Sequence, residues 1–420
     1  MRATKDSGFE WIGEIPTSWK LYKGKYMFTQ RNLRGNAIEL QLLSPTQKYG
    51  VVPQSVYEDR SGMNAVKLNE NANLSALKTI HKGDFCISLR SFQGGFEYSE
   101  YEGVVSPAYQ VFYPVVKVAR GYYKYLFKES GFIEKMNSYT MTLRDGKNIA
   151  FADFGNTYIP CPPVDEQQRI ADFLDAKCAE IDALTADIQT QIDTLEQYKR
   201  SVITETVTKG LNPDAEMKDS GVFYMAPMNA AWKLTKIGYI CSKLSRSFAP
   251  EDTALICSNK GKVQVRADDL TGIMVSDDNA MQGIHAGDIA IHGMDTWHGA
   301  IALSEYDGKI TRVVHVCDST EDKRFIVYYM QHLAFQGVYK LISNGVRGNT
   351  SDFRSWDKVR DIWIAIPETK EEQAAICDYL DSQCTAVEEV IATKKEQLEV
   401  LGEYKKSLIF EYVTGKKEVI

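Results

Sequence analysis

Three polar loops in this sequence carry side chains of the kind that binds nucleic acids, and each loop has a counterpart in the other half of the chain. The first pair holds Arg31 and Arg34 at residues 30–36 and Arg246 at residues 243–247. Arginine and asparagine form paired hydrogen bonds with the edges of guanine and adenine. We therefore predict that these loops contact nucleic acid. An ordinary polar turn is the alternative for any one loop taken alone.

The second pair of loops lies at residues 140–148 and 344–351, and the third at residues 90–95 and 294–299. Their glycines permit close approach to phosphates, and their Arg, Lys, Asn and Thr side chains supply hydrogen-bond donors. The candidate DNA-binding residues from these loops and their borders are Arg31, Arg34, Arg90, Arg144, Lys147, Asn148, Arg246, Trp297, Arg347, Asn349, Thr350 and Arg354.

Charge is distributed unevenly along the chain. The formal net charge of −7 excludes a polycationic protein of the histone type. Residues 1–163 nevertheless carry 20 Lys and Arg against 15 Asp and Glu, whereas residues 164–212 and 368–420 each have a net charge of −5. An acidic protein binds nucleic acid when its basic groups share one face. Solvated helix faces would give the same distribution, so charge alone leaves both interpretations open.

Motifs typical of catalytic chains are absent. The sequence has no Gly-x-x-x-x-Gly-Lys-Ser/Thr, no Gly-x-Gly-x-x-Gly, no Gly-x-Ser-x-Gly and no Asn/Asp-Pro-Pro-aromatic tetrapeptide. The 6 His and 8 Cys show no metal-ligand spacing. We predict no catalytic residue, no bound cofactor and no metal site in this chain. A degenerate nuclease motif of the Asp…Glu-x-Lys type is not excluded by pattern.

No apolar run approaches the ~20 residues that cross a bilayer. The N-terminus lacks the apolar core of a signal peptide. We expect a cytoplasmic protein that makes no membrane contact.

The sequence contains one series of landmarks twice, in the same order. Each copy has an Asp-Ser-Gly opening, a Gly-Asp before an apolar run, an acidic-Gln pair that opens a long periodic segment, and a Tyr-Lys near its end. These lie at 6–8 and 219–221, 83–84 and 287–288, 166–167 and 372–373, and 198–199 and 404–405. The shared order indicates an internal duplication.

Each copy begins with a mixed module of short strands and helices. Apolar-aromatic runs predict strands at 83–89 and 108–113, and at 287–291 and 313–317 in the second copy. Helices are predicted at 122–130 and 324–336. The fold class is therefore α+β, with modules at 1–163 and 213–367.

A long helix is predicted after each module, at 164–212 and 368–420. Apolar residues recur about every seven positions, which is typical of a coiled-coil seam. The seam residues are Leu174, Ile181, Ile188, Leu195, Val202, Leu380, Val387, Leu401 and Leu408, and Lys394 interrupts the second series. About 44 helical residues would span about 65 Å. Two such helices packed antiparallel would bury both stripes; a local helical hairpin in each copy is the alternative.

The whole arrangement resembles the DNA specificity subunit of type I restriction-modification enzymes. The resemblance is carried by the opening residues 6–19, the Ile-Pro-x-Pro-Pro…Glu-Gln-Gln-Arg-Ile-Ala run at 159–171, the long helices, and the Tyr-Lys-Arg-Ser-Val-Ile stretch at 198–203. It covers essentially the whole chain. The second copy departs from the family pattern at residues 224–227, which replace the Trp-Ile-Gly-Glu of 11–14.

The resemblance implies two tandem target-recognition domains, each followed by a long helix, with the two helices in an antiparallel coiled coil of pseudo-twofold symmetry. Each domain would read one half of a bipartite, asymmetric double-stranded DNA site. As a hypothesis, Arg31, Arg34, Arg144 and Lys147 serve the first half-site, and the second is served by Arg246, Arg347, Asn349 and Arg354. The helices would set the half-site spacing. Half-sites one turn apart lie about 34 Å centre to centre, and a helix pair of about 65 Å with a module at each end could accommodate that distance.

The resemblance also implies partners. The helices would dock two adenine methyltransferase subunits, and motor-nuclease restriction subunits would complete the enzyme. S-adenosylmethionine, ATP and Mg²⁺ would belong to those partners, and this chain would not itself be an enzyme. A coiled-coil scaffold without DNA readout is the alternative function.

Overall fold

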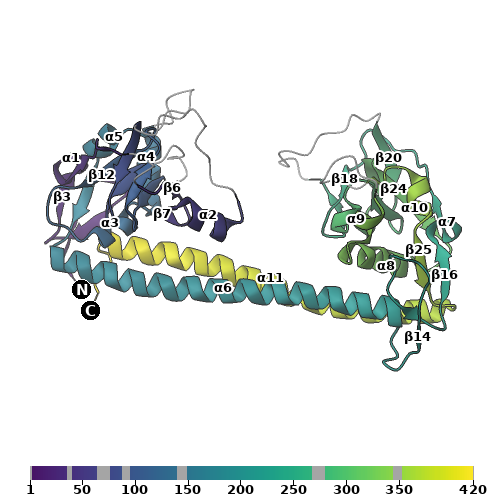
Figure 1. The fold of residues 1–420 in the computed structure, drawn as a ribbon. Coiled ribbons are helices and arrows are strands. Elements are labelled where there is room, and N and C mark those ends of the chain that lie inside the picture. Colours follow the sequence, from purple (N-terminus) through teal and green to yellow (C-terminus); the bar gives the residue numbers. More distant parts are fainter. Residues whose placement is uncertain are drawn as a thin grey trace. The chain divides into compact units, whose positions relative to one another are not determined.

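The computed structural model describes residues 2–35, 40–63, 76–87, 95–139, 149–266, 280–343 and 352–419. The chain forms two compact units. Unit 1 comprises Met1–Ile188 with Glu396–Ile420, and unit 2 comprises Gln189–Lys395. Each unit contains one globular module and part of each long helix (Figure 1). The boundaries between recognition domains and helices given above stay a prediction.

The module of unit 1 is built on an antiparallel four-stranded sheet in the order β10-β9-β12-β4. Around it lie a three-stranded sheet, β11-β8-β5, and the pairs β13-β3, β6-β7 and β1-β2. The strands are β1 (Thr4–Asp6), β2 (Glu14–Pro16), β3 (Lys20–Lys23), β4 (Phe28–Gln30), β5 (Arg34–Gly35), β6 (Leu43–Thr46), β7 (Gly50–Pro53), β8 (Leu77–Ile80), β9 (Phe85–Ile87), β10 (Phe96–Tyr98), β11 (Gly103–Val105), β12 (Gln110–Pro114) and β13 (Tyr158–Cys161).

Aromatic side chains fill the core between this sheet and the helices of unit 1. Phe28 from β4 lies edge-on to Phe112 and Phe127, with ring centroids 5.7 and 5.6 Å away. The helices are α1 (Gly24–Met27), α2 (Gln54–Ser61), α3 (Arg120–Leu126), α4 (Ser130–Ser138), α5 (Phe151–Asn156) and α6 (Val164–Lys209).

The single helix predicted at 122–130 is wrong at its C-terminal end. Helix α3 ends at Leu126, and α4 begins at Ser130. The carboxylate of Glu129 accepts hydrogen bonds from the backbone N–H groups of Gly131 and Phe132, both at 2.8 Å. This N-cap satisfies donors that a continuous helix would have paired internally, so a second helix starts here.

Unit 2 repeats the plan of unit 1. Its four-stranded sheet has the order β17-β24-β21-β22, and the pairs β16-β25, β20-β23, β18-β19 and β14-β15 surround it. The strands are β14 (Met217–Lys218), β15 (Met228–Asn229), β16 (Lys233–Lys236), β17 (Cys241–Lys243), β18 (Leu255–Cys257), β19 (Val263–Val265), β20 (Met281–Ile284), β21 (Ile289–His292), β22 (Ile301–Leu303), β23 (Gly308–Thr311), β24 (Val314–Ser319) and β25 (Trp363–Ile366).

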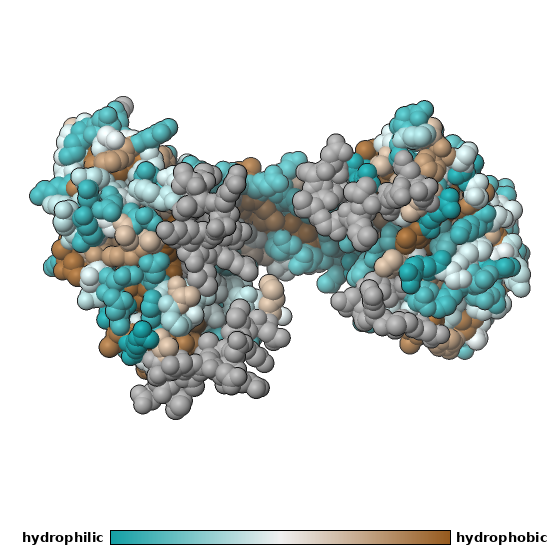
Figure 2. Space-filling view, turned by 90° about the horizontal axis from the view of Figure 1, so that it is seen from above, coloured by the Kyte–Doolittle hydropathy of each residue, from teal (hydrophilic) through white to brown (hydrophobic). Residues whose placement is uncertain are grey.

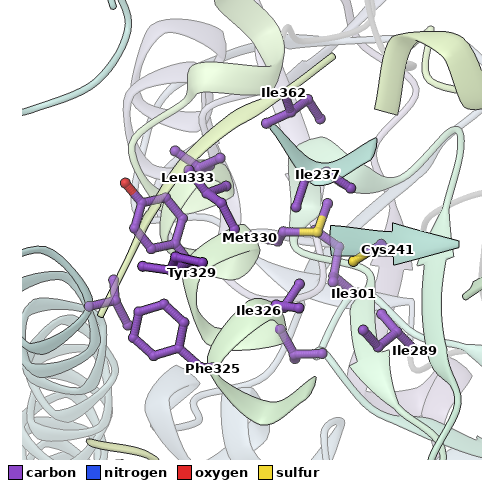
Figure 3. Close-up of a cluster of buried hydrophobic side chains, with 14 of the residues drawn as sticks. Ile237, Cys241, Ile289, Ile301, Phe325, Ile326, Tyr329, Met330, Leu333 and Ile362 are labelled. Carbon is purple, nitrogen blue, oxygen red and sulfur yellow. The ribbon is translucent and has the colours of Figure 1, made fainter. Parts of the chain in front are cut away.

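Aliphatic residues take the place of many aromatic ones in the core of unit 2. Ile326 and Met330 of α8 point toward Ile289 and Ile301 of the sheet, whereas Phe325 lies on the other side of the cluster beside Tyr329 (Figure 3). The helices are α7 (Ile237–Ile240), the short 3₁₀ helix η4 (Thr296–His298), α8 (Lys323–Phe335), α9 (Val338–Ile342), α10 (Trp356–Arg360) and α11 (Lys370–Val413). Written in the reverse direction, the order of unit 2 is β22-β21-β24-β17, which matches β10-β9-β12-β4 of unit 1 strand for strand. This match confirms the predicted duplication.

The long helices α6 and α11 pack against each other in antiparallel orientation, as predicted. In unit 1 the Lys405 ammonium lies 2.6 Å from the Asp182 carboxylate. In unit 2 Lys199 pairs with Glu388. From the first ion pair to the second, the residue number increases along α6 and decreases along α11, as in an antiparallel pair. A glycine with positive φ follows the C-terminus of each helix, Gly210 at +89° after α6 and Gly415 at +73° two residues after α11, a conformation that favours glycine.

The predicted seam residues lie on the inner side of this helix pair. Six of them are buried, namely Leu174, Ile181, Ile188, Leu380, Val387 and Leu408. The other three, Leu195, Val202 and Leu401, are half-buried. Leu174 also packs into the core of its module, as does Leu380 in unit 2. The helices are therefore joined to the modules by apolar packing within each unit.

Candidate nucleic-acid interface

The predicted DNA-binding residues fall into two groups. Five lie in described parts of the structure: Arg31, Arg34, Arg246, Trp297 and Arg354. The other seven lie outside the described residues, and their placement stays a prediction: Arg90, Arg144, Lys147, Asn148, Arg347, Asn349 and Thr350.

Arg31, directly after β4, forms a two-point ion pair with Asp84. Its Nε donates to Oδ2 at 2.6 Å and its Nη2 to Oδ1 at 3.2 Å. The Asp84 side chain is only 1% exposed. The guanidinium also lies 4.2 Å from the ring centroid of Tyr113, within the range of a cation–π contact. This fork is thus directed into the protein.

Arg246 forms the corresponding pair in unit 2. Its Nε and Nη2 donate to the two carboxylate oxygens of Asp288 at 2.8 and 2.9 Å. Asp288 is almost fully buried, and hydrogen bonding to it raises the pKa of Arg246. The sequence pointed to both arginines but not to their carboxylate partners. The repeated Gly-Asp landmark was the signal that could have identified them.

Each of these carboxylates also closes the turn that precedes its strand. The backbone N–H of His81 donates to Asp84 at 3.0 Å, and that of His285 donates to Asp288 at 2.9 Å. Both turns contain a glycine with positive φ, Gly83 and Gly287. A buried carboxylate therefore holds the same tight turn in both units.

Arg34 differs from Arg31 because its side chain is exposed. On β5 it lies opposite Lys78 of β8 in the strand register. The Lys78 ammonium donates to the Tyr109 carbonyl at 2.7 Å. Burial lowers the pKa of Lys78, and the Arg34 charge lowers it further. Two neighbouring cations of this kind favour an anion such as a DNA phosphate.

Trp297 and Arg354 belong to two segments that meet in unit 2. Trp297 is in η4, on the turn between β21 and β22; it is half-buried, and its indole N–H has no hydrogen-bond partner among the described residues. The N–H of Phe353 donates to the carbonyl of Gly293 in the same turn at 3.0 Å, and Arg354, the next residue, is exposed. A side chain on Gly293 would meet the Arg354 backbone at 2.9 Å, so glycine permits this approach.

Among the described residues, no group of three or more His, Cys, Asp and Glu side chains is placed to hold a metal ion. None of the described helices is both long enough and apolar enough to span a membrane.

Comparison with known proteins gives a consistent picture. Residues 20–194 match the family model described as "Type I restriction modification DNA specificity domain". No curated protein sequence matches this chain. A solved structure described as "Structural basis underlying complex assembly and conformational transition of the type I R-M system" is similar to this chain with a TM-score of 0.69 and 15% identity, covering 96% of this chain and 99% of its own.

The crystal structure of the HsdS subunit from Thermoanaerobacter tengcongensis is also similar. The TM-score is 0.50 at 14% identity, and the match covers 98% of this chain and 100% of that subunit. At these identities the two structures show a shared fold, which includes both modules and both long helices.

Proposed function

We propose that this chain, whose residues 20–194 match the family model of type I restriction-modification DNA specificity domains, is the sequence-specific specificity subunit of a type I restriction-modification enzyme. The observation that carries the proposal, beside the family match, is one strand scaffold built twice with different loop residues. Two modules of equal construction and unequal surface would read two different half-sites, which makes a bipartite and asymmetric site.

Recognition rests on the exposed arginines of the modules and the side chains beside them. Arg34 with Lys78 would serve the first half-site and Arg354 with Trp297 the second, together with the loops at 140–148 and 344–351. An arginine on a base edge contributes about 1–3 kcal/mol of discrimination, whereas one on a phosphate weakens binding to all sequences alike.

The long helices would dock two adenine methyltransferase subunits. Leu184 of α6 and Tyr404 of α11 are 48% and 54% exposed. Both lie near the Asp182–Lys405 ion pair, at the same position along the length of the helix pair. In unit 2, Tyr198 and Val390 are 50% and 45% exposed near the Lys199–Glu388 pair. We call these patch 1 and patch 2. Hydrophobic surface is visible along the helices in Figure 2.

The two patches are related by the duplication, because Leu184 corresponds to Val390 and Tyr198 to Tyr404, each 206 positions later. Each patch thus combines one residue from each copy, as expected if the same partner binds twice. Motor-nuclease subunits would complete the enzyme. S-adenosylmethionine, ATP and Mg²⁺ would be held by these partners, and this chain would contribute no catalytic group.

DNA binding by the purified complex tests this function. The chain is co-expressed with the adenine methyltransferase encoded beside it, and binding to sheared genomic DNA is selected and sequenced at increasing salt. We expect a split motif to be enriched, with affinity that falls steeply as salt rises because phosphate contacts release counterions. A stable complex that enriches no motif at any salt concentration would favour the scaffold alternative.

A further inference from the structure

The arginines of the two Arg–Asp ion pairs come from different backbone positions in the two units. The N–H of Arg31 donates to the Val111 carbonyl at 2.8 Å, and in unit 2 the matching bond runs from Leu244 to Val316 at 2.7 Å. Arg31 is therefore the backbone counterpart of Leu244.

The residue two positions further along completes the comparison. The carbonyl of Leu33 accepts from the N–H of Thr79 at 2.9 Å, and that of Arg246 accepts from Gly283 at 3.0 Å. Leu33 is thus the counterpart of Arg246. The arginine and the leucine have exchanged places between the units, while the buried acceptors Asp84 and Asp288 have stayed in place at the start of β9 and β21.

The surroundings of the pair have diverged in the same way. The Tyr113 ring lies under the guanidinium in unit 1, and the corresponding strand position in unit 2 is Asp318, a carboxylate; the two residues face Thr29 and Ser242 in the strand registers. A cation from the following helix donates to a carbonyl of the turn in both units: Arg120 to Lys82 at 3.1 Å and Lys323 to Gly287 at 2.9 Å. The origin of the arginine, this neighbouring position and the helix cation have all changed, and the ion pair has persisted.

From this exchange we infer that Arg31 and Arg246 are positioning residues that fix the recognition loops and do not read the DNA. The inference rests on the proposed function. The arginine links the end of β4 to the turn before β9 in unit 1, and the end of β17 to the turn before β21 in unit 2, although it comes from a different residue position in each. Residues 32–35, including Arg34, follow directly after this link, so the ion pair fixes the path of their backbone.

The test transplants the arrangement of unit 2 into unit 1. We compare Arg31→Leu, Asp84→Asn and the double exchange Arg31→Leu/Leu33→Arg, each in the complete complex with its methyltransferase. The probe is a genomic fragment that carries the motif methylated by the wild-type complex. Both single changes should slow methyl transfer by about tenfold, as expected for a coupled buried pair. The double exchange should restore it to within about twofold, because the relocated arginine meets Asp84 as Arg246 meets Asp288.

Two readouts separate positioning from direct contact and from misfolding. The single changes should relax sequence choice in only one half of the motif, and Asp288→Asn should relax the other half. If Arg31 contacted a base, Asp84→Asn would leave it free to do so and activity would survive, while the double exchange would not restore the Arg31→Leu loss. Either result overturns the inference.

Failure of the proposed function has a different signature. A wild-type complex that methylates no motif would contradict the specificity-subunit assignment itself, whatever the variants do. Arg34→Gln serves as the matched control. It should lower the affinity of the complex for DNA, and adding Leu33→Arg should not restore that affinity.

Discussion

The Lys128 ammonium lies 2.7 Å from Oε1 of Glu97, while Oε2 of the same carboxylate is buried without a hydrogen-bond partner among the described residues. Glu97 is only 1% exposed. Burial raises the pKa of Glu97 to about 7, and the Lys128 charge offsets only part of that effect. A carboxyl whose pKa is raised on folding favours the folded state at low pH and loses that contribution as the pH rises through the folded-state value.

Unit 1 should therefore gain stability through Glu97 on mild acidification. Between about pH 8 and pH 6 the gain in the free energy of unfolding should be about 1 kcal/mol. Glu97→Gln should remove this pH dependence, and Glu100→Gln, a change at an exposed neighbour, should leave it intact. Urea unfolding followed at both pH values measures the difference; equal pH slopes for wild type and Glu97→Gln would contradict the assignment.

His332 should act in the opposite direction in unit 2. It is buried on α8, its Nδ1 lies 3.1 Å from the Thr204 hydroxyl, and burial lowers the pKa of His332 to about 4. A neutral buried histidine stabilises the fold above its unfolded pKa of about 6.5 and loses that contribution as the pH falls. Lowering the pH from about 8 to about 5 should cost about 2 kcal/mol, absent in His332→Gln. An unchanged pH slope in this variant, measured by urea unfolding, would refute the prediction.

A buried glutamine joins each long helix to its module. Gln167 accepts from the N–H of Ala119 at 2.9 Å and donates to the carbonyl of Pro162 at 2.9 Å. Gln167→Ala leaves both groups unsatisfied and should lower the free energy of unfolding by roughly 2–4 kcal/mol.

The neighbouring Gln168 provides the control for this change, because it is exposed and bonds only along the helix to Asp172. Gln168→Ala should change stability by less than about 0.5 kcal/mol. Gln373 repeats the arrangement in unit 2, accepting from Asp322 at 2.9 Å and donating to Pro367 at 3.1 Å, so Gln373→Ala should have a similar effect there. Thermal unfolding that fails to separate Gln167→Ala from Gln168→Ala would rule out this role.

Patch 1 should bind one methyltransferase subunit. Changing Leu184 and Tyr404 to Ser together should reduce the methyltransferase content of the complex from two copies to one, because patch 2 is untouched. The matched control is Val400→Ser: Val400 is 67% exposed on the same helix, but its counterpart is Thr194, so this apolar site is not repeated. Native mass spectrometry gives the count, and two retained copies in the patch 1 variant would exclude the patch as a docking site.

The long helices and the duplication could be predicted from the sequence because their signals are local or repeated. The spacing of Leu174, Ile181 and Ile188 is visible over about four turns without knowledge of any partner, and α6 runs from Val164 to Lys209 without interruption. Recurrence of the Asp-Ser-Gly and Gly-Asp landmarks identifies the second copy although most other residues differ.

The arrangement of the charged side chains could not be predicted in the same way. Arg31 and Asp84 are separated by 53 residues, and the sequence does not state that strand β4 ends beside the turn before β9. Arg31 and Arg34 were therefore expected to play one role, although the former is paired inside the module and the latter is exposed. The break between α3 and α4 also escaped prediction, because glutamate is an uncommon N-cap residue.

The central claim is tested most directly by mapping adenine methylation across the host genome in strains with and without this chain. The account predicts a split motif, two specific half-sites joined by a fixed non-specific spacer, that is methylated on both strands and lost on deletion. Replacing only residues of the unit 2 module should then change only one half of the motif. A genome whose methylation is unaltered by deletion, although the methyltransferase is expressed and bound to this chain, would contradict the account.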